Sequence, residues 1–96
     1  MPTILIVDDH PSFRSTARVL LQAEGFDVVL LDVQLPDFDG FEVARRLATT
    51  NGGSPVVILT SSRDAADFGP LVEQSGARGF VPKAELSGAA LSALLD

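Results

Sequence analysis

The fold of this chain is decided by two stretches, ILIVDD at residues 4–9 and VVLLD at residues 28–32. Each contains four consecutive aliphatic residues followed by aspartate, a pattern typical of parallel strands buried on both faces. Ligands of open α/β sheets bind outside the carboxyl ends of the strands, so we expect Asp8, Asp9 and Asp32 to converge in one crevice. Crowded carboxylates repel one another unless a cation joins them. The cluster therefore predicts a divalent metal ion with oxygen ligands.

The rest of the sequence alternates between helical and strand patterns. The predicted helices cover residues 11–24, 41–48, 64–75 and 86–94, and further strands are predicted at residues 56–59 and 80–81. The helix over residues 64–75 is the weaker one, because Gly69 and Pro70 interrupt it. The third strand runs directly into Thr60, and the fourth ends near Lys83. Strands that alternate with helices predict an α/β fold with a parallel sheet.

The composition is that of one small acidic domain. The 96 residues carry a net charge of −6, which argues against direct binding of nucleic acid. Without cysteine and with His10 as the one histidine, the chain offers neither a disulfide framework nor a zinc centre. No apolar stretch reaches the roughly 20 residues of a membrane span, and no charged leader precedes the first strand. We expect a single cytoplasmic domain over residues 1–96, without an output domain.

The polar residues at the strand ends match the requirements of phosphoryl transfer. Asp32 is the candidate nucleophile, because a strand-end carboxylate can attack phosphorus and form an acyl phosphate. Asp8 and Asp9 are candidate ligands of Mg²⁺, which would neutralise oxygens of the incoming group. The Thr60 hydroxyl and the Lys83 ammonium are expected to contact the remaining phosphoryl oxygens. Together these residues supply the positioning and the countercharge on which phosphoryl transfer depends.

Several motifs, occurring in this order, resemble the receiver domain of bacterial response regulators. They are VDDH at residues 7–10, LLDVQLPDFDG at 30–40, ILT at 58–60 and FVPK at 80–83. The sequence that follows the first strand is similar to that of receivers of LuxR-type regulators. The resemblance implies a phosphoprotein of a two-component phosphorelay, which receives its phosphoryl group from a sensor histidine kinase or a phosphotransfer protein and acts on an unknown output partner. Such a module is not an enzyme beyond phosphorylating itself from small acyl phosphates and dephosphorylating itself.

The resemblance also implies a role for each site residue. The implied metal ligands are Asp8, Asp9, Asp32 and the backbone carbonyl of Gln34. The implied phosphoacceptor is Asp32, the switch hydroxyl is Thr60, the switch aromatic is Phe80 and the phosphate-sensing lysine is Lys83. Ala84 replaces the proline that often follows this lysine in the family.

One departure from the family is large. Only 22 residues lie between Asp9 and Asp32, whereas two helices and a strand separate these positions in the family. A crossover between parallel strands needs at least about a dozen residues, so the interval holds one helix and no more. We infer that the second strand and the second helix are missing. The expected fold is a flavodoxin-like (CheY-like) doubly wound parallel sheet, reduced to about four strands and four helices.

This deletion changes the direction of the first crossover. In the 2-1-3-4-5 order of a receiver sheet, the first helix leads to the strand on the outer side of strand one. Without that strand the helix must lead to the opposite side, where a right-handed connection places it on the other face of the sheet. Three outcomes are open: the first helix changes face, makes a rare left-handed connection, or is exchanged between chains. Loss of the edge strand also exposes the backbone of residues 4–7, which favours a homodimer.

Two other functions stay open beside the phosphoacceptor. One is a receiver-derived binding or folding module whose site the deletion has uncoupled, because a shift of about 1 Å costs about two orders of magnitude in rate. The other is a phosphatase of the haloacid-dehalogenase type. That chemistry requires Asp-x-Asp at a strand end, and Gln34 stands where the second acid would be.

Overall fold

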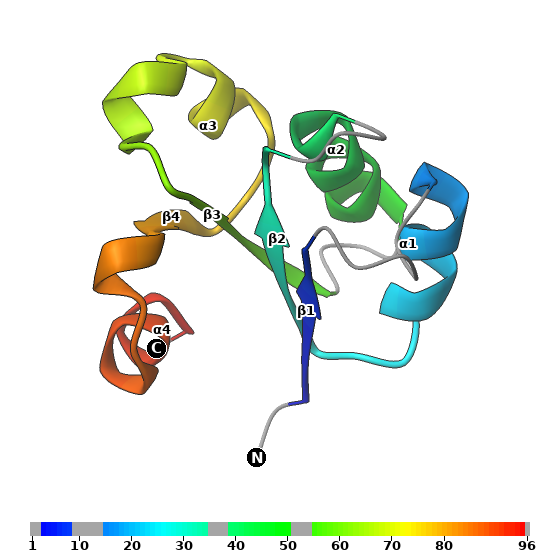
Figure 1. The fold of residues 1–96 in the computed structure, drawn as a ribbon. Helices are drawn as coiled ribbons and strands as arrows, with labels where there is room; N and C mark the ends of the chain where they lie inside the picture. Colours follow the sequence, from blue (N-terminus) through cyan, green and yellow to red (C-terminus); the bar gives the residue numbers. More distant parts are fainter. Residues whose placement is uncertain (1–2, 9–14, 35–38, 51–54, 96) are drawn as a thin grey trace.

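The computed structural model describes residues 3–8, 15–34, 39–50 and 55–95, which form one parallel sheet with helices on both sides (Figure 1). In chain order the elements are β1 (Ile4–Val7), α1 (Thr16–Ala23), β2 (Val28–Asp32), α2 (Gly40–Thr50), β3 (Val56–Ser61), η2 (Ala65–Phe68), α3 (Leu71–Gln74), β4 (Gly79–Pro82), η3 (Lys83–Glu85) and α4 (Gly88–Leu95). The sheet has four strands in the order β1-β2-β3-β4. The predicted reduced α/β fold is confirmed.

The strand register aligns the carboxyl ends of the first three strands. Val7 pairs with Leu31, and Asp32 pairs with Thr60 on β3. Asp8 directly follows β1, so it reaches the level of Asp32 at the same edge of the sheet. The strand that carries Asp32 is therefore flanked by the two strands whose ends were predicted to complete the site.

Two apolar clusters cover the two faces of the sheet. The larger cluster consists of residues from β1, β2, β3, α1 and α2, with partly buried side chains of η2, α3 and β4 packed against it. The smaller one joins Val28, Leu30, Ile58 and Val81 to the apolar residues of α4 and to Leu86. Figure 1 accordingly shows α1 and α2 on one side of the strands and α4 on the other.

The first helix has changed face relative to the receiver arrangement. The connections through α1, α2 and α3 all step in the same direction along the sheet, and all three helices pack on the face of the larger cluster. The three connections therefore have the same handedness, and the connection through α1 is not a left-handed exception. Of the three predicted outcomes, the structure has the relocated helix. It satisfies the connectivity within one chain.

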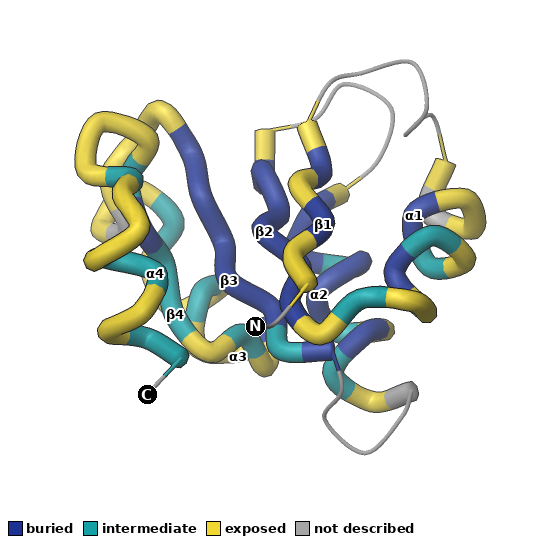
Figure 2. The backbone as a smooth tube through the Cα atoms, turned by 90° about the horizontal axis from the view of Figure 1, so that it is seen from below, coloured by how far each residue is buried: buried dark blue, intermediate teal, exposed yellow. Residues whose placement is uncertain are grey.

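The relocation of α1 leaves one face of β1 uncovered. Leu5 and Val7 are buried in the larger cluster, whereas Ile4 is 37% and Ile6 is 59% exposed. In Figure 2 the tube of β1 alternates between exposed and buried segments, while the neighbouring β2 is buried almost throughout. A strand with the pattern of two buried faces is thus buried on one face only.

The weaker of the predicted helices divides into two short elements. The 3₁₀ helix η2 ends at Gly69, whose φ of 58° and ψ of −134° form a conformation that glycine adopts readily. Pro70 precedes the single helical turn of α3. The prediction of one continuous helix over residues 64–75 is wrong. The helix is interrupted at Gly69 and Pro70, the residues that made the prediction weak.

Two other helices begin later than predicted. In α1, the Ser15 hydroxyl accepts a hydrogen bond from the Arg18 backbone N–H at 3.2 Å, which caps the helix start. Residues 9–14, which the predicted helix partly covers, lie outside the described part of the chain. The last helix begins at Gly88, where the Ser87 hydroxyl accepts from the Ala90 N–H. None of the described helices is long and apolar enough to span a membrane.

Candidate functional site: the carboxyl ends of β1, β2 and β3

Asp32 occupies a protected position at the end of β2. The residue is 6% exposed, and its two carboxylate oxygens have different partners. The Gln34 backbone N–H donates to Oδ1 at 2.8 Å, and Lys83 Nζ lies 2.6 Å from Oδ2. A buried carboxylate requires such partners, because its desolvation is otherwise costly. The candidate nucleophile therefore has its charge balanced by the predicted lysine.

Lys83 reaches Asp32 from the segment after β4, two strands away in the sheet. It begins η3 directly after Pro82, which pairs with Ser61 at the end of β3. Its side chain is 48% exposed, so the ammonium meets the buried carboxylate from the solvent side. This arrangement leaves the lysine accessible to an anion that approaches from the same direction.

Thr60 lies beside Asp32 but bonds in the other direction. It is buried, and its hydroxyl donates to the Val81 carbonyl oxygen on β4 at 2.7 Å. The Thr60 carbonyl accepts from the Val33 backbone N–H at 3.0 Å, which ties the segment after Asp32 to β3. The predicted switch hydroxyl therefore lies on the strand next to that of Asp32 and is hydrogen-bonded to β4.

Gln34 forms a contact that sequence reasoning missed. Its side-chain carbonyl Oε1 accepts hydrogen bonds from Ser61 Oγ at 2.5 Å and Ser62 Oγ at 3.0 Å. The amide thereby links the segment after β2 to the segment after β3. The available signal was that the two serines follow Thr60 directly, at the end of the strand next to that of Asp32.

Only some of the predicted metal ligands lie in the described part of the chain. Asp8 is exposed and lies at the level of Asp32, whereas Asp9 lies outside the described part of the chain. Within that part, no three His, Cys, Asp or Glu side chains gather closely enough to hold a metal ion. The donors at this edge are carboxylate and amide oxygens, the ligands that Mg²⁺ prefers, so the chemistry of the donor set fits that ion.

Phe80 belongs to a row of three aromatic rings. Its ring centroid lies 5.8 Å from that of Phe68 on η2, and Phe68 meets Phe41 edge to face at 5.4 Å. Phe41 follows Gly40, where an added Cβ would lie 2.6 Å from the Val33 Cα. The predicted switch aromatic is thus connected to the start of α2, which packs against the backbone beside Asp32. Phe68 had no predicted role.

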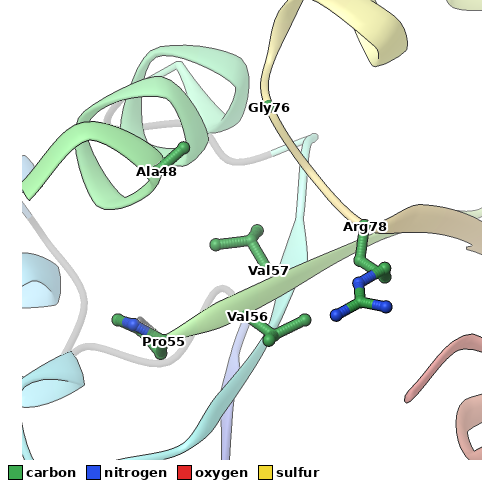
Figure 3. A pocket seen from close by; sticks show the side chains of 6 residues that line it. All are labelled: Ala48, Pro55, Val56, Val57, Gly76 and Arg78. Carbon is green, nitrogen blue, oxygen red and sulfur yellow. The ribbon is translucent and has the colours of Figure 1, made fainter. Parts of the chain in front are cut away.

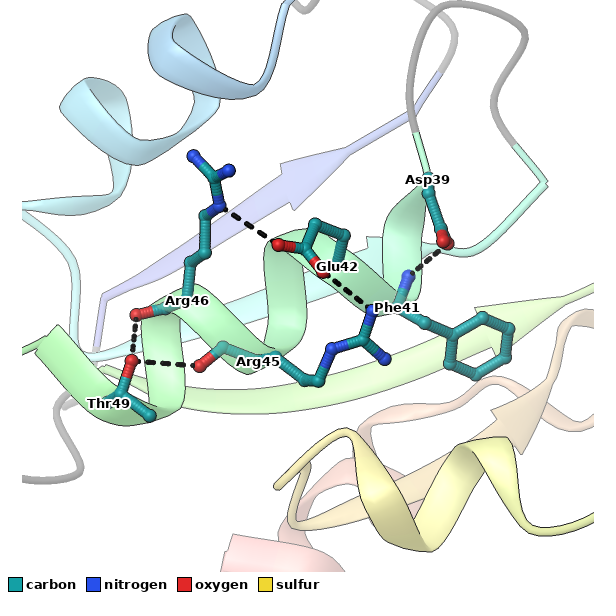
Figure 4. Close-up of polar contacts among 6 residues, drawn as sticks. All are labelled: Asp39, Phe41, Glu42, Arg45, Arg46 and Thr49. Carbon is teal, nitrogen blue, oxygen red and sulfur yellow. Dashed lines mark hydrogen bonds and ion pairs between the residues drawn. The ribbon is translucent and has the colours of Figure 1, made fainter.

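The start of α2 is held by polar contacts that Figure 4 shows in detail. The Asp39 carboxylate accepts from the Phe41 backbone N–H at 2.9 Å. Along the exposed side, Glu42 pairs with Arg45 at 2.6 Å and with Arg46 at 3.2 Å. The hydrogen bonds from Arg45 and then from Arg46 lower the pKa of the Glu42 carboxyl below its usual value. These solvated pairs belong to the helix surface and not to the site.

A pocket of about 150 Å³ lies elsewhere, near the start of β3 (Figure 3). Its lining residues are Ala48, Pro55, Val56, Val57, Gly76 and Arg78. The lining carries no carboxylate, and the amino end of β3 is opposite to the end that carries Thr60. This pocket is therefore separate from the acidic site.

Comparison with known proteins identifies the class to which this fold and site belong. The family model of the response regulator receiver domain matches residues 17–95. The chain belongs to this family. The matched range contains Asp32, Thr60 and Lys83, whereas Asp8 and Asp9 precede it.

Two curated relatives are transcriptional regulators. A putative transcriptional regulator of Pseudomonas aeruginosa is 36% identical over 88% of this chain and 51% of that protein. The putative positive transcription regulator of virulence factors BvgA, of Bordetella pertussis, is 35% identical over 85% of this chain and 49% of that protein. The chain thus spans about half the length of these relatives.

The solved structures agree with the family, and the alignment lengths agree with a shortened chain. The BeF3-activated receiver domain of DrrB has a TM-score of 0.75 and 26% identity, covering 99% of this chain and 94% of that one. The alignment with the Pseudomonas relative extends over 106 residues while using 88% of a 96-residue chain, so about twenty aligned positions have no counterpart here. That length fits the missing strand and helix.

Proposed function

We propose that this chain is the phosphoacceptor module of a two-component phosphorelay and that Asp32 receives the phosphoryl group. The observation that carries this proposal is the buried Asp32 carboxylate, paired with Lys83 at 2.6 Å and lying in register with Thr60. A buried strand-end carboxylate with a lysine countercharge and a neighbouring hydroxyl is suited to phosphoryl transfer, which depends on positioning and charge neutralisation. Membership of the receiver family supports the same chemistry.

In the transfer step, one oxygen of Asp32 forms a bond to phosphorus. The bond between phosphorus and the donor breaks at the same time, and its electron pair leaves with the donor. The donor is a phosphohistidine of a sensor kinase or phosphotransfer protein, or a small acyl phosphate. Lys83 already lies at Asp32 Oδ2, so a small movement brings its ammonium to a phosphoryl oxygen, where the charge-assisted hydrogen bond is strong.

The metal requirement of the module is assigned to Mg²⁺. Its proposed ligands are Asp8, Asp9, Asp32 and the backbone carbonyl of Gln34. When bound, the ion would neutralise charge on the phosphoryl oxygens. The Gln34 backbone N–H already donates to Asp32 Oδ1, which holds the segment after β2 against the carboxylate that the ion would share.

Occupancy of Asp32 is proposed to be reported through Thr60 and Phe80. The Thr60 hydroxyl would exchange the Val81 carbonyl for a phosphoryl oxygen. Val81 lies next to Phe80 on β4, so a change in the hydrogen bonding of this carbonyl would alter the position of the Phe80 ring, which packs on Phe68. The module then signals in the cytoplasm to an output partner, and it has no further enzymatic activity beyond its own phosphorylation and dephosphorylation.

The test is incubation with Mg²⁺ and acetyl phosphate, followed by intact-mass measurement. Addition of one phosphoryl group is expected for the wild type and is expected to be lost in Asp32→Asn. Asp64→Asn is the matched control, because it makes the same chemical change at an exposed residue before η2, where asparagine can also serve as an N-cap. A folded wild type that gains no phosphoryl group would overturn the proposal.

That result would favour the second candidate, a receiver-derived binding module with an uncoupled site. The observation in its favour is the relocation of α1, which follows the strand that carries the acidic pair. A phosphatase of the haloacid-dehalogenase type is disfavoured, because the position of its second acid is taken by Gln34, whose amide accepts from two serines.

A further inference from the structure

Strand β1 has both an edge without a described partner strand and exposed apolar side chains, and the two occur at the same residues. Its neighbour on one side is β2, and no described strand pairs with its other side. Ile4 and Ile6 are 37% and 59% exposed on the face of the sheet that carries α4, and neither residue belongs to the cluster that α4 covers there. The edge and the face are therefore both open along residues 4–7.

The backbone of the same two isoleucines faces the open edge. The Val28 N–H donates to the Thr3 carbonyl at 3.0 Å, so Thr3 directs its polar groups toward β2. Neighbouring residues of a strand alternate in the side to which their N–H and C=O groups point. Leu5 and Val7 consequently bond toward β2, and Ile4 and Ile6 present their N–H and C=O groups to the outside.

The other edge of the sheet is protected, whereas β1 is not. Strand β4 ends in Pro82, which cannot donate to a further strand, and both η2 and α4 contact it. Between Ile4 and Val7 the sequence has no charged residue and no proline. Sheets normally discourage pairing at an edge with such residues, so β1 is an open template for another strand.

We propose that β1 pairs with β1 of a second copy of this chain, antiparallel, around a two-fold axis through Leu5. In this register Ile4 lies opposite Ile6 of the partner subunit, and each pair exchanges two backbone hydrogen bonds at a Cα separation of about 5.5 Å. The four isoleucine side chains then form two cross-strand pairs on the uncovered face. One pairing satisfies both the polar edge and the apolar face, which makes the strand complementary to itself.

Charge favours the antiparallel arrangement between two acidic copies. Each chain has a net charge of −6, and Asp8 and Asp32 lie at the carboxyl ends of their strands. Antiparallel pairing places these acidic ends at opposite ends of the combined sheet. Because the added apolar area is small against the roughly 800 Å² that each partner of a stable complex buries, the dimer is expected to depend on protein concentration.

Sedimentation velocity over a concentration series tests the dimer. The wild type is expected to shift from monomer to dimer as concentration rises, and Ile6→Lys is expected to stay monomeric. Leu71→Lys is the matched control: it places the same charge on an exposed leucine of α3, 40% exposed, and is expected to dimerise like the wild type. A wild type that is monomeric throughout, or a control that dissociates equally, would overturn the proposal.

Cysteine cross-linking tests the register, because the natural chain has no cysteine. Ile4→Cys and Ile6→Cys are prepared separately and oxidised alone and as a mixture. The proposed register predicts that the mixture gives mainly the heterodimer of the two variants, in which a disulfide joins position 4 of one chain to position 6 of the other, since their Cα separation suits that bond. Cross-linking of Ile6→Cys with itself in equal or greater yield would contradict the register. This outcome is independent of phosphorylation at Asp32.

Discussion

Lys83 Nζ lies 2.6 Å from Asp32 Oδ2, and the two side chains differ greatly in exposure, 48% against 9%. The lysine thus brings solvent-accessible positive charge to a carboxylate that is almost fully removed from water. The pairing keeps the Asp32 carboxylate in a protected place while the lysine that balances its charge stays exposed to solvent.

Removal of the lysine is expected to destabilise the fold. Lys83→Met leaves the buried Asp32 carboxylate without its countercharge, and we expect a loss of about 1–2 kcal/mol. This is less than for a fully buried pair because the lysine is half exposed. Urea unfolding measures the loss. In the double variant Asp32→Asn/Lys83→Met the loss should be smaller than the sum of the two single losses; additive losses would show that the pair contributes nothing.

The two hydrogen bonds that Gln34 accepts from Ser61 and Ser62 are expected to contribute unequally to the stability of the fold. Ser61 is fully buried, whereas Ser62 is exposed. Gln34→Ala removes the acceptor of a buried hydroxyl and should cost about 1 kcal/mol in unfolding free energy. Ser62→Ala, at the solvent side of the same amide, should stay within about 0.5 kcal/mol of the wild type. Thermal unfolding by circular dichroism compares the variants, and the reverse order would contradict the assignment.

Two glycine substitutions should differ in sign. An added Cβ at Gly40 would lie 2.6 Å from the Val33 Cα and 3.0 Å from the Asp32 carbonyl oxygen, whereas nothing lies within 4 Å of one at Gly25. Gly40→Ala is expected to cost about 1–3 kcal/mol, because backbone must move to admit the methyl group. Gly25→Ala should be neutral or stabilising by up to about 1 kcal/mol. Urea titrations compare the two variants, and equal losses would refute the close approach of α2 to β2.

The surface pair on α2 should make stability depend weakly on acid. The folded-state pKa of Glu42 lies below its usual value, chiefly through the hydrogen bond from Arg45. A carboxyl with a lowered folded pKa stabilises the fold above its unfolded pKa, and this contribution is lost as the pH falls through the folded pKa. Glu42→Gln should therefore reduce the loss of stability on acidification. Chemical unfolding at neutral and acidic pH checks this, and an unchanged pH slope would contradict it.

The sequence was sufficient for the parts of the fold that depend on strand patterns and connection lengths. The aliphatic runs before Asp8 and Asp32 predicted parallel strands, and the short interval between Asp9 and Asp32 predicted a relocated first helix as one of three outcomes. The choice among the three depends on packing. Val19 and Ala23 of α1 are both fully buried in the cluster that contains α2. The periodicity of the sequence shows that these residues are apolar on one side of the helix, but it does not indicate on which face of the sheet they pack.

Contacts between side chains of distant segments were beyond the sequence patterns. Phe68 reads as one residue of an interrupted helix, and its position between Phe41 and Phe80 arises only when η2 folds back over the sheet. The Gln34 amide likewise meets Ser61 because β2 and β3 are neighbours in register. Motifs indicated the strand ends, but they did not indicate which polar groups bond across them.

The direct connection from β1 through α1 to β2 also bears on how the protein folds. In this sheet β1 pairs with the very next strand of the chain, with Ile4 opposite Val28, and the single helix α1 connects the two. A shorter loop costs less entropy to close, at about 0.6 kcal/mol for each halving of its length, and pairing between nearby segments speeds folding. We therefore expect the pairing of β1 with β2 to form early during folding, because one short connection joins the two strands.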